Sequence, residues 1–177
     1  MRLFIALPVT AGVKRAIADT QKELKRRGVN GRYTPPENLH MTLVFIGNAK
    51  ETEKISRALR KNPVPRTALT FDRLALFGDT LVALYKNSAA LESYVRELRK
   101  ALDEEEVSFD RQAFRAHVTL CRKAAPQPEG PRFWECGSTL KSVRLPVNRV
   151  LLFESDLSGK TPVYTALDSA SAYSRKQ

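Results

Sequence analysis

Two short stretches decide how this chain folds: His40-Met41-Thr42-Leu43 and His117-Val118-Thr119-Leu120. Each consists of a histidine, any residue, a threonine and an apolar residue (H-x-T-Φ), and the chain's 2 histidines both lie in this tetrad. Chance would place both histidines of a chain in such a pattern about once in a thousand. The duplication therefore indicates a functional pair rather than two isolated structural histidines. It also suggests two halves that are built alike.

Each motif is expected to open a β-strand, and the alternation of a strand sorts its side chains onto two faces. His40 and Thr42 then point to one face, while Met41 and Leu43 point to the other. The second motif repeats this arrangement. Each strand is therefore predicted to place an imidazole beside a hydroxyl on one face and to pack the core with the opposite face.

The apolar pattern around the motifs predicts an α+β fold, because antiparallel-looking hairpins separate the helices. Strands are expected over residues 2–7, 41–46, 68–77, 81–85, 116–122, 140–145, 149–153 and 163–167. Helices are expected from a cap at Thr10 to a stop at Gly28, from about Glu51 to before Pro63, and after a cap at Ser88. The Pro/Gly-rich stretch 124–131 is too short for a domain linker, so residues 1–177 are expected to form one domain.

The chain is strongly basic, with a formal net charge of +11 and a sequence pI of about 10.0. Such a charge favours a polyanionic partner such as RNA or DNA, although it also serves solubility alone. No apolar run approaches the roughly 18 residues that span a bilayer, and no signal-peptide pattern opens the sequence. A cytoplasmic protein that does not bind membranes is therefore expected.

Two imidazoles on facing strands are suited to proton transfer in both directions near neutral pH. Displacement at phosphorus needs a base for the attacking hydroxyl or water and an acid for the departing oxygen. Thr42 and Thr119 can bind the non-bridging phosphate oxygens. Arg115 and Arg122 flank the second motif and can hold the phosphate charge, or they are ordinary surface charges.

These motifs, in a small α+β chain, resemble those of the 2H phosphoesterase superfamily. The opening Arg2-Leu3-Phe4-Ile5-Ala6-Leu7, the lead-in Pro36-Glu37-Asn38-Leu39, and Phe114-Arg115 before His117 resemble its RNA 2′,3′-cyclic phosphodiesterase branch, also called 2′-5′ RNA ligase. Ser155 and Tyr164 extend the resemblance toward the end of the chain. Ala116 departs from it, because family members often have proline there.

The resemblance implies two lobes with antiparallel sheets and pseudo-two-fold symmetry around a central groove, with the helices outside. It implies hydrolysis of a terminal 2′,3′-cyclic phosphate to a 2′-phosphate without metal or cofactor and, in some members, reversible joining to 2′-5′ linked RNA. By analogy, His40 is the proton donor to the leaving 3′ oxygen and His117 is the proton acceptor that activates water. The sequence leaves the direction of these two roles open. A monomer is expected.

Two aromatic residues are further candidates for contacts with the substrate. Phe4 and Tyr33 can each stack on a base at the groove. For Phe4, which lies on a predicted strand, packing in the core is the favoured role.

Two other classes of function compete with catalysis by the two histidines. One is a zinc protein that uses His40, His117, Cys121 and Cys136, although their spacing matches no common zinc module and leaves the duplicated threonines unexplained. The other is a non-catalytic RNA- or nucleotide-binding module on the same fold. A nucleotide-driven ligase is weaker than either, since no G-x-x-x-x-G-K-[ST] loop is present.

Overall fold

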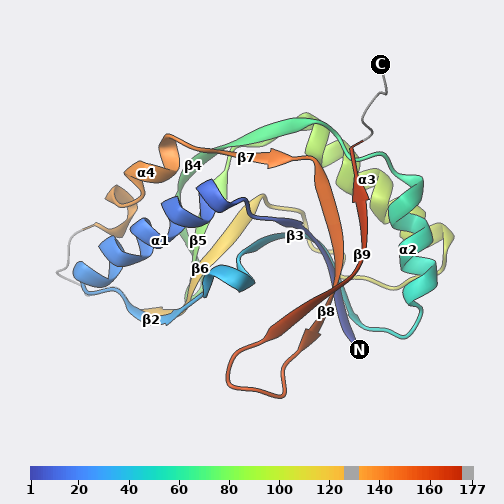
Figure 1. Cartoon of the computed structure of the whole chain (residues 1–177), viewed down its shortest axis with the longest axis horizontal. Helices are drawn as coiled ribbons and strands as arrows, with labels where there is room; N and C mark the ends of the chain where they lie inside the picture. Colours follow the sequence, from blue (N-terminus) through green and yellow to red (C-terminus); the bar gives the residue numbers. More distant parts are fainter. Residues whose placement is uncertain (126–131, 173–177) are drawn as a thin grey trace.

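The computed structural model describes residues 1–125 and 132–172, so most of the expected loop 124–131 lies outside the described residues. The helices are α1 (Ala11–Arg26), α2 (Thr52–Lys61), α3 (Ala89–Glu104) and α4 (Ser138–Lys141), with short 3₁₀ turns η1 (Pro36–Asn38) and η2 (Phe133–Glu135). The strands are β1 (Arg2–Pro8), β2 (Asn30–Tyr33), β3 (His40–Asn48), β4 (Thr67–Phe77), β5 (Thr80–Tyr85), β6 (His117–Ala125), β7 (Arg144–Val147), β8 (Arg149–Asp156) and β9 (Val163–Ser171). The α+β class is confirmed (Figure 1).

The strands form two antiparallel sheets, one in the order β3-β1-β8-β9 and the other in the order β2-β6-β5-β4-β7. When each sheet is read outward from its motif strand, the order β3-β1-β8-β9 in one sheet corresponds to the order β6-β5-β4-β7 in the other. Strand β4 follows the first motif strand in the chain but joins the sheet of the second motif. Strands β8 and β9 follow the second motif strand but join the sheet of the first motif. This exchange produces the pseudo-two-fold arrangement that the resemblance implied.

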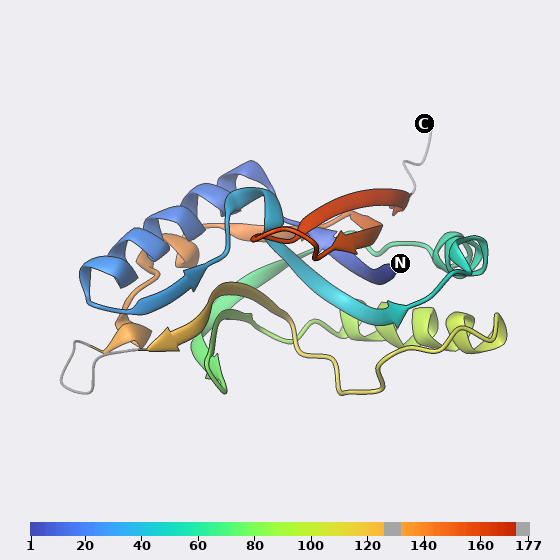
Figure 2. The same cartoon turned by 90° about the horizontal axis from the view of Figure 1, so that it is seen from below.

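The helices lie in two pairs at opposite ends of the molecule (Figure 1). Helix α1 contacts α4, which packs on β4, whereas α2 contacts α3 and β9, and α3 contacts β3. The perpendicular view places α1 and α3 on opposite sides of the strands (Figure 2). Over residues 1–125 and 132–172, none of the helices combines the length and apolarity needed to cross a bilayer.

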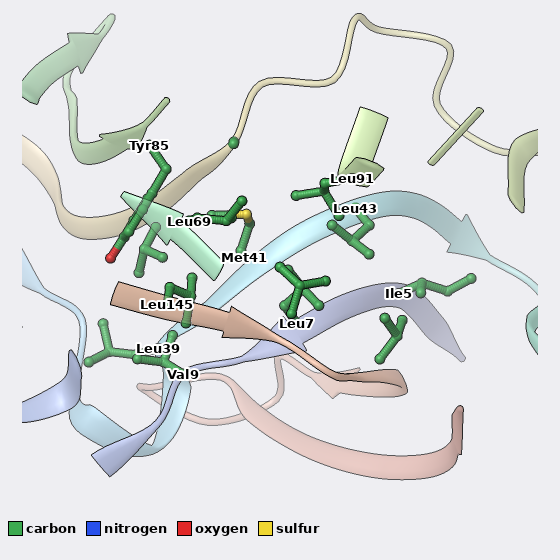
Figure 3. Packing of buried hydrophobic residues seen from close by; sticks show 14 of the residues in the cluster. Ile5, Leu7, Val9, Leu39, Met41, Leu43, Leu69, Tyr85, Leu91 and Leu145 are labelled. Carbon is green, nitrogen blue, oxygen red and sulfur yellow. The ribbon is translucent and has the colours of Figure 1, made fainter. Parts of the chain in front are cut away.

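The core is formed by both sheets together with helices α1, α2 and α3, and it explains why the motif strands alternate as they do. Leu7 and Met41 from one sheet and Leu69 and Leu145 from the other belong to one cluster of buried side chains (Figure 3). Burial of each such side chain contributes roughly 1.5–3 kcal/mol to folding. The apolar face of each motif strand is thereby held in the core, and the histidine face must point away from it.

The helix and hairpin predictions are largely confirmed. Thr10 is the N-cap residue of helix α1, as predicted, although its side chain makes no capping hydrogen bond. Ser88 does cap α3, because its hydroxyl accepts a hydrogen bond from the Leu91 backbone N–H at 3.4 Å. Strands β4 and β5 form the expected hairpin, which turns at Gly78 with φ +60°.

The expected strand over residues 140–145 is wrong in its first part. Helix α4 ends at Lys141, and the strand itself begins at Arg144. Leu140 is fully buried, and the Thr139 hydroxyl donates to the Ala16 carbonyl of α1 at 3.2 Å. Packing against α1 therefore overrides the local β-pattern of this segment.

Strand β2 has no counterpart among the predicted strands, because Asn30-Gly31-Arg32 has the composition of a turn. Gly31 has a φ of +153° and lies so close to β6 that a Cβ atom would come within 2.5 Å of Cys121 Sγ. A glycine is therefore needed for this close pairing. Cys121 and Cys136 are both buried free thiols.

Candidate active site

The two H-x-T-Φ motifs open β3 and β6, and these strands contact each other although they belong to different sheets. His40 lies opposite Pro8 and Thr42 opposite Ala6, and the second motif repeats this register with Leu84 and Val82. In both strands the histidine and threonine are half-buried, whereas the residues between and after them are buried. The predicted division into two faces is confirmed.

Both histidine rings are oriented by the backbone in the same way. His40 Nδ1 lies 2.8 Å from the Asn38 carbonyl oxygen, and His117 Nδ1 lies 2.7 Å from the Arg115 carbonyl oxygen. Because a carbonyl oxygen can only accept a hydrogen bond, each Nδ1 must carry the proton and donate it. Nε2 then holds the lone pair in the neutral ring, so it is the atom that can exchange a proton with a substrate.

A β-bulge brings Arg122 to the same face as the histidines. Cys121 pairs with Leu81 and Thr119 pairs with Val82, so β6 has one additional residue at this point. Arg122, three residues after Thr119, would point to the opposite face of a regular strand, and the bulge reverses this alternation. Strand β3 has a bulge at the equivalent place, where Phe45 takes the position of Arg122.

The charge of Arg122 acts on both imidazoles. Burial lowers the pKa of His40 to about 4, with further lowering by Arg122 and His117 and an opposing effect of the hydrogen bond to Asn38. Burial also lowers the pKa of His117; the hydrogen bond to the Arg115 carbonyl opposes this effect, and the charges of Arg115 and Arg122 lower the pKa further. Without a ligand both rings are therefore neutral at neutral pH. A bound phosphate would favour the protonated form of either ring, because its negative charge offsets that of Arg122.

Aromatic side chains surround His40. The Phe4 ring centroid is 4.8 Å from that of His40 and 5.2 Å from that of Phe153, and Tyr164 forms a T-shaped pair with His40 at a centroid distance of 5.1 Å. Phe4 is only 4% exposed, as expected for core packing. It thereby supports the ring of His40. Phe153 and Tyr164 were not among the predicted site residues, although Tyr164 belonged to the resemblance.

An aromatic side chain, that of Phe77, also lies beside His117. The rings of Phe77 and His117 form a T-shaped pair with centroids 5.1 Å apart, and the Arg115 guanidinium carbon lies 4.1 Å from the Phe77 centroid. Phe77 pairs with Thr80 of β5 as Phe153 pairs with Phe4 of β1, so the two phenylalanines occupy equivalent positions. This equivalence follows from strand register, which no local sequence signal reports.

The four ligands of the zinc alternative are not gathered into one site. Within residues 1–125 and 132–172, no three histidine, cysteine, aspartate or glutamate side chains lie close enough to hold a metal ion together. Among the described residues, Tyr33 forms no ring pair with His40 or His117, whereas Phe4 packs against His40. It lines a separate cavity that also includes Arg122.

One family description matches this chain twice. It is that of the LigT-like phosphoesterases, which matches residues 7–84 and again residues 82–164, so that each match contains one H-x-T-Φ motif. The chain belongs to the LigT-like phosphoesterase family. The double match confirms that the chain consists of two halves built alike, and it makes this protein a phosphoesterase by membership.

Relatives within the LigT-like family extend over nearly the whole chain. An RNA 2′,3′-cyclic phosphodiesterase of Thermus thermophilus is 29% identical over 188 residues, covering 97% of this chain and 90% of its own. A Thermotoga maritima protein of the same name is 26% identical, covering 94% and 93%. The crystal structure of TT0787 of Thermus thermophilus superimposes with a TM-score of 0.74 at 26% identity, covering 99% of this chain and 100% of that one.

Proposed function

We propose that this protein is an RNA 2′,3′-cyclic phosphodiesterase that uses His40 and His117 as an acid–base pair. The observation that carries the proposal is the shared geometry of the two rings. Both are fixed through Nδ1, both present Nε2, and the charge of Arg122 acts on both. The name shared by the Thermus and Thermotoga relatives supplies the substrate class.

The chemistry follows from these groups. His117 Nε2 takes a proton from water, and the water oxygen forms a bond to phosphorus as the bond from phosphorus to the 3′ oxygen breaks. His40 Nε2–H donates its proton to that leaving oxygen, which leaves a 2′-phosphate and a 3′-hydroxyl. Because burial lowers the pKa of His40 to about 4, its ring becomes a proton donor near neutral pH only when the bound phosphate raises that pKa.

In this proposal Thr42 and Thr119 donate hydrogen bonds to the two non-bridging oxygens, which is supported by their position two residues after a histidine on the same face. Arg122 offsets the phosphate charge, and Arg115 does so beside His117. The same site accepts a 5′-hydroxyl of a second RNA in place of water. Attack by that hydroxyl with loss of the 3′ oxygen yields a 2′-5′ linkage, and the reverse reaction uses the same two histidines.

The experiment that tests the function is incubation with an oligonucleotide that ends in a 2′,3′-cyclic phosphate, followed by separation of the 2′- from the 3′-phosphate product. We expect the 2′-phosphate. Formation of the 3′-phosphate would reverse the leaving oxygen, and absence of turnover with retained binding would favour a non-catalytic RNA-binding module.

We expect full activity in excess EDTA, because the proposed acid, base and phosphate ligands are all side chains of the chain itself. Initial rates on a 2′,3′-cyclic mononucleotide would be compared with and without EDTA, and again after addition of Mg²⁺, Mn²⁺ or Zn²⁺. Loss of turnover on chelation, restored by one of these ions, would assign the chemistry to a metal.

We expect kcat/KM for a cyclic mononucleotide to be greatest below pH 6.5, the ordinary pKa of histidine. The kcat/KM profile reports the free enzyme, in which the pKa of both histidines is lowered. As pH rises, the acid loses its proton; as pH falls, the base gains one. Both limbs therefore lie on the acid side of 6.5.

The substitution Arg122→Gln tests the cause of this shift. It removes a charge that lowers the pKa of both histidines, so the optimum is expected to move to higher pH. Lys123→Gln is the matched control, because it removes an adjacent charge that does not contribute to either histidine pKa. An optimum above about pH 7 in the wild type, or an equal shift in both variants, would contradict this account.

A further inference from the structure

A small cavity adjoins the site on the His40 side. Its volume is about 180 Å³, and Arg32, Tyr33, Asn38, Arg122 and Lys160 are among the residues that line it. Two of these residues connect it to the reacting groups: the Asn38 carbonyl accepts the hydrogen bond from His40, and the charge of Arg122 acts on both histidines. A substrate whose phosphate lies between the histidines can therefore extend into this cavity.

The charge of the cavity favours the phosphate chain of RNA. Its lining includes three cationic residues, Arg32, Arg122 and Lys160, and no carboxylate among the described residues. Across the part of the chain that the structure describes, none of the three takes part in a salt bridge. Their charge is thus available to an external anion.

The cavity next to the other motif differs in this respect. It adjoins the lead-in to His117, and its lining includes Asp72 and Glu92 beside its basic residues. Asp72 forms an ion pair with Arg73 in this cavity. The two ends of the site are therefore unequal, and a polyanion is expected to extend toward the end without carboxylates.

Tyr33 supplies a fixed aromatic surface in the wall of the basic cavity. Its hydroxyl donates a hydrogen bond to the Val29 carbonyl at 2.7 Å, and the Lys25 ammonium lies 4.6 Å from its ring centroid. Burial raises the pKa of Tyr33 to about 12, so the phenol stays neutral at any working pH. A ring that is already immobilised can stack on a base with little further loss of side-chain entropy.

Asn38 fixes another part of the cavity lining. Its side chain is buried, and Nδ2 donates a hydrogen bond to the Pro162 carbonyl at 2.8 Å. This contact ties the connection between β8 and β9, which includes Lys160, to the lead-in of His40. The cavity is therefore formed before a ligand arrives.

We propose that this cavity binds the nucleotide that precedes the cyclic-phosphate end of the RNA. Arg32 and Lys160 bind the phosphate that joins the last two nucleotides, and Tyr33 stacks on the preceding base. The inference rests on the proposed function and deepens it, because it states on which side of the histidines the RNA chain lies. It also predicts a preference for oligonucleotides over cyclic mononucleotides.

Three substrates separate the parts of this subsite. They are adenosine 2′,3′-cyclic phosphate, the same compound with a 5′-phosphate, and the ApA dinucleotide that ends in a 2′,3′-cyclic phosphate. The second adds the phosphate without the preceding base, and the third adds both. We expect the wild-type kcat/KM to rise along this series.

The variants Arg32→Gln and Lys160→Gln are each expected to lower kcat/KM about threefold to fivefold for the two longer substrates. For the plain cyclic mononucleotide the change is expected to stay within about twofold. Tyr33→Leu is expected to lower the ratio of the dinucleotide to the 5′-phosphorylated substrate about tenfold, whereas Tyr33→Phe keeps it. Lys86→Gln is the matched control, because Lys86 is an exposed lysine that lines the other cavity.

Each possible outcome discriminates between hypotheses. Equal rates for all three wild-type substrates, or variants that affect them all alike, would overturn the subsite while leaving the phosphodiesterase intact. A loss of dinucleotide preference in Lys86→Gln but not in Lys160→Gln would place the RNA chain on the opposite side. Absence of turnover on every substrate by the wild type would overturn the proposed function and this inference with it.

Discussion

Replacement of His40 or His117 by alanine is expected to lower kcat for a 2′,3′-cyclic mononucleotide by about 10²-fold or more. Each substitution removes one of the two Nε2 atoms that exchange protons with the substrate. The double variant is expected to be little worse than either single one, because a donor without an acceptor no longer completes the reaction. Initial rates under saturating substrate, measured together with thermal melting, check this result.

Matched controls separate chemistry from folding. Met41→Leu and Leu120→Met change the opposite face of the same strands with little change in volume, so they are expected to keep near wild-type turnover. RNA binding should survive in both alanine variants. A single histidine variant with near wild-type turnover would remove that histidine from the mechanism and would favour the binding-module alternative for its motif.

The substitutions Thr42→Val and Thr119→Val are expected to cost about 1–3 kcal/mol each in transition-state stabilisation, measured as the loss in kcat/KM. Valine keeps the branched shape that suits a strand but lacks the hydroxyl that is placed to bind a non-bridging oxygen. Thr42→Ser and Thr119→Ser keep the hydroxyl and are therefore expected to retain most of the activity.

A different result would identify a structural role for the threonines. Thr42 and Thr119 are half-buried, so valine at either position should leave the melting temperature nearly unchanged. Unchanged kinetics together with a large fall in melting temperature would show that these hydroxyls support the fold and do not bind phosphate.

The face of β6 on which Arg122 lies depends on strand pairing, which local sequence patterns do not report. The alternation of a regular strand places His117 and Thr119 together but puts Arg122 on the other face. The bulge between Thr119 and Cys121 reverses that assignment. The sequence alone leaves Arg122 undecided between a phosphate ligand and a surface charge, because an additional residue in one strand depends on how its partner strand pairs.

Helix α4 and strand β2 show the same limit in the fold. Leu140 lies in a segment with β-forming residues, yet its burial against α1 makes the segment helical. Gly31 gives β2 the composition of a turn, yet the close approach of Cys121 and Arg122 requires that glycine within a strand. In both places the contact that decides the structure comes from a distant part of the chain.

The sequence by itself determined the α+β class, the two matching halves, the shared face of each histidine and threonine, and the phosphoesterase family. These features depend on the short-range periodicity of apolar residues and on the duplicated H-x-T-Φ tetrad. Both patterns can be recognised within a few consecutive residues. Only the tertiary structure decided that β4 and β8 exchange sheets, that Nδ1 of each ring donates to the backbone, and that Arg122 lies with the histidines. Those features depend on strand pairing and burial between residues far apart in the chain, and no local pattern specifies them.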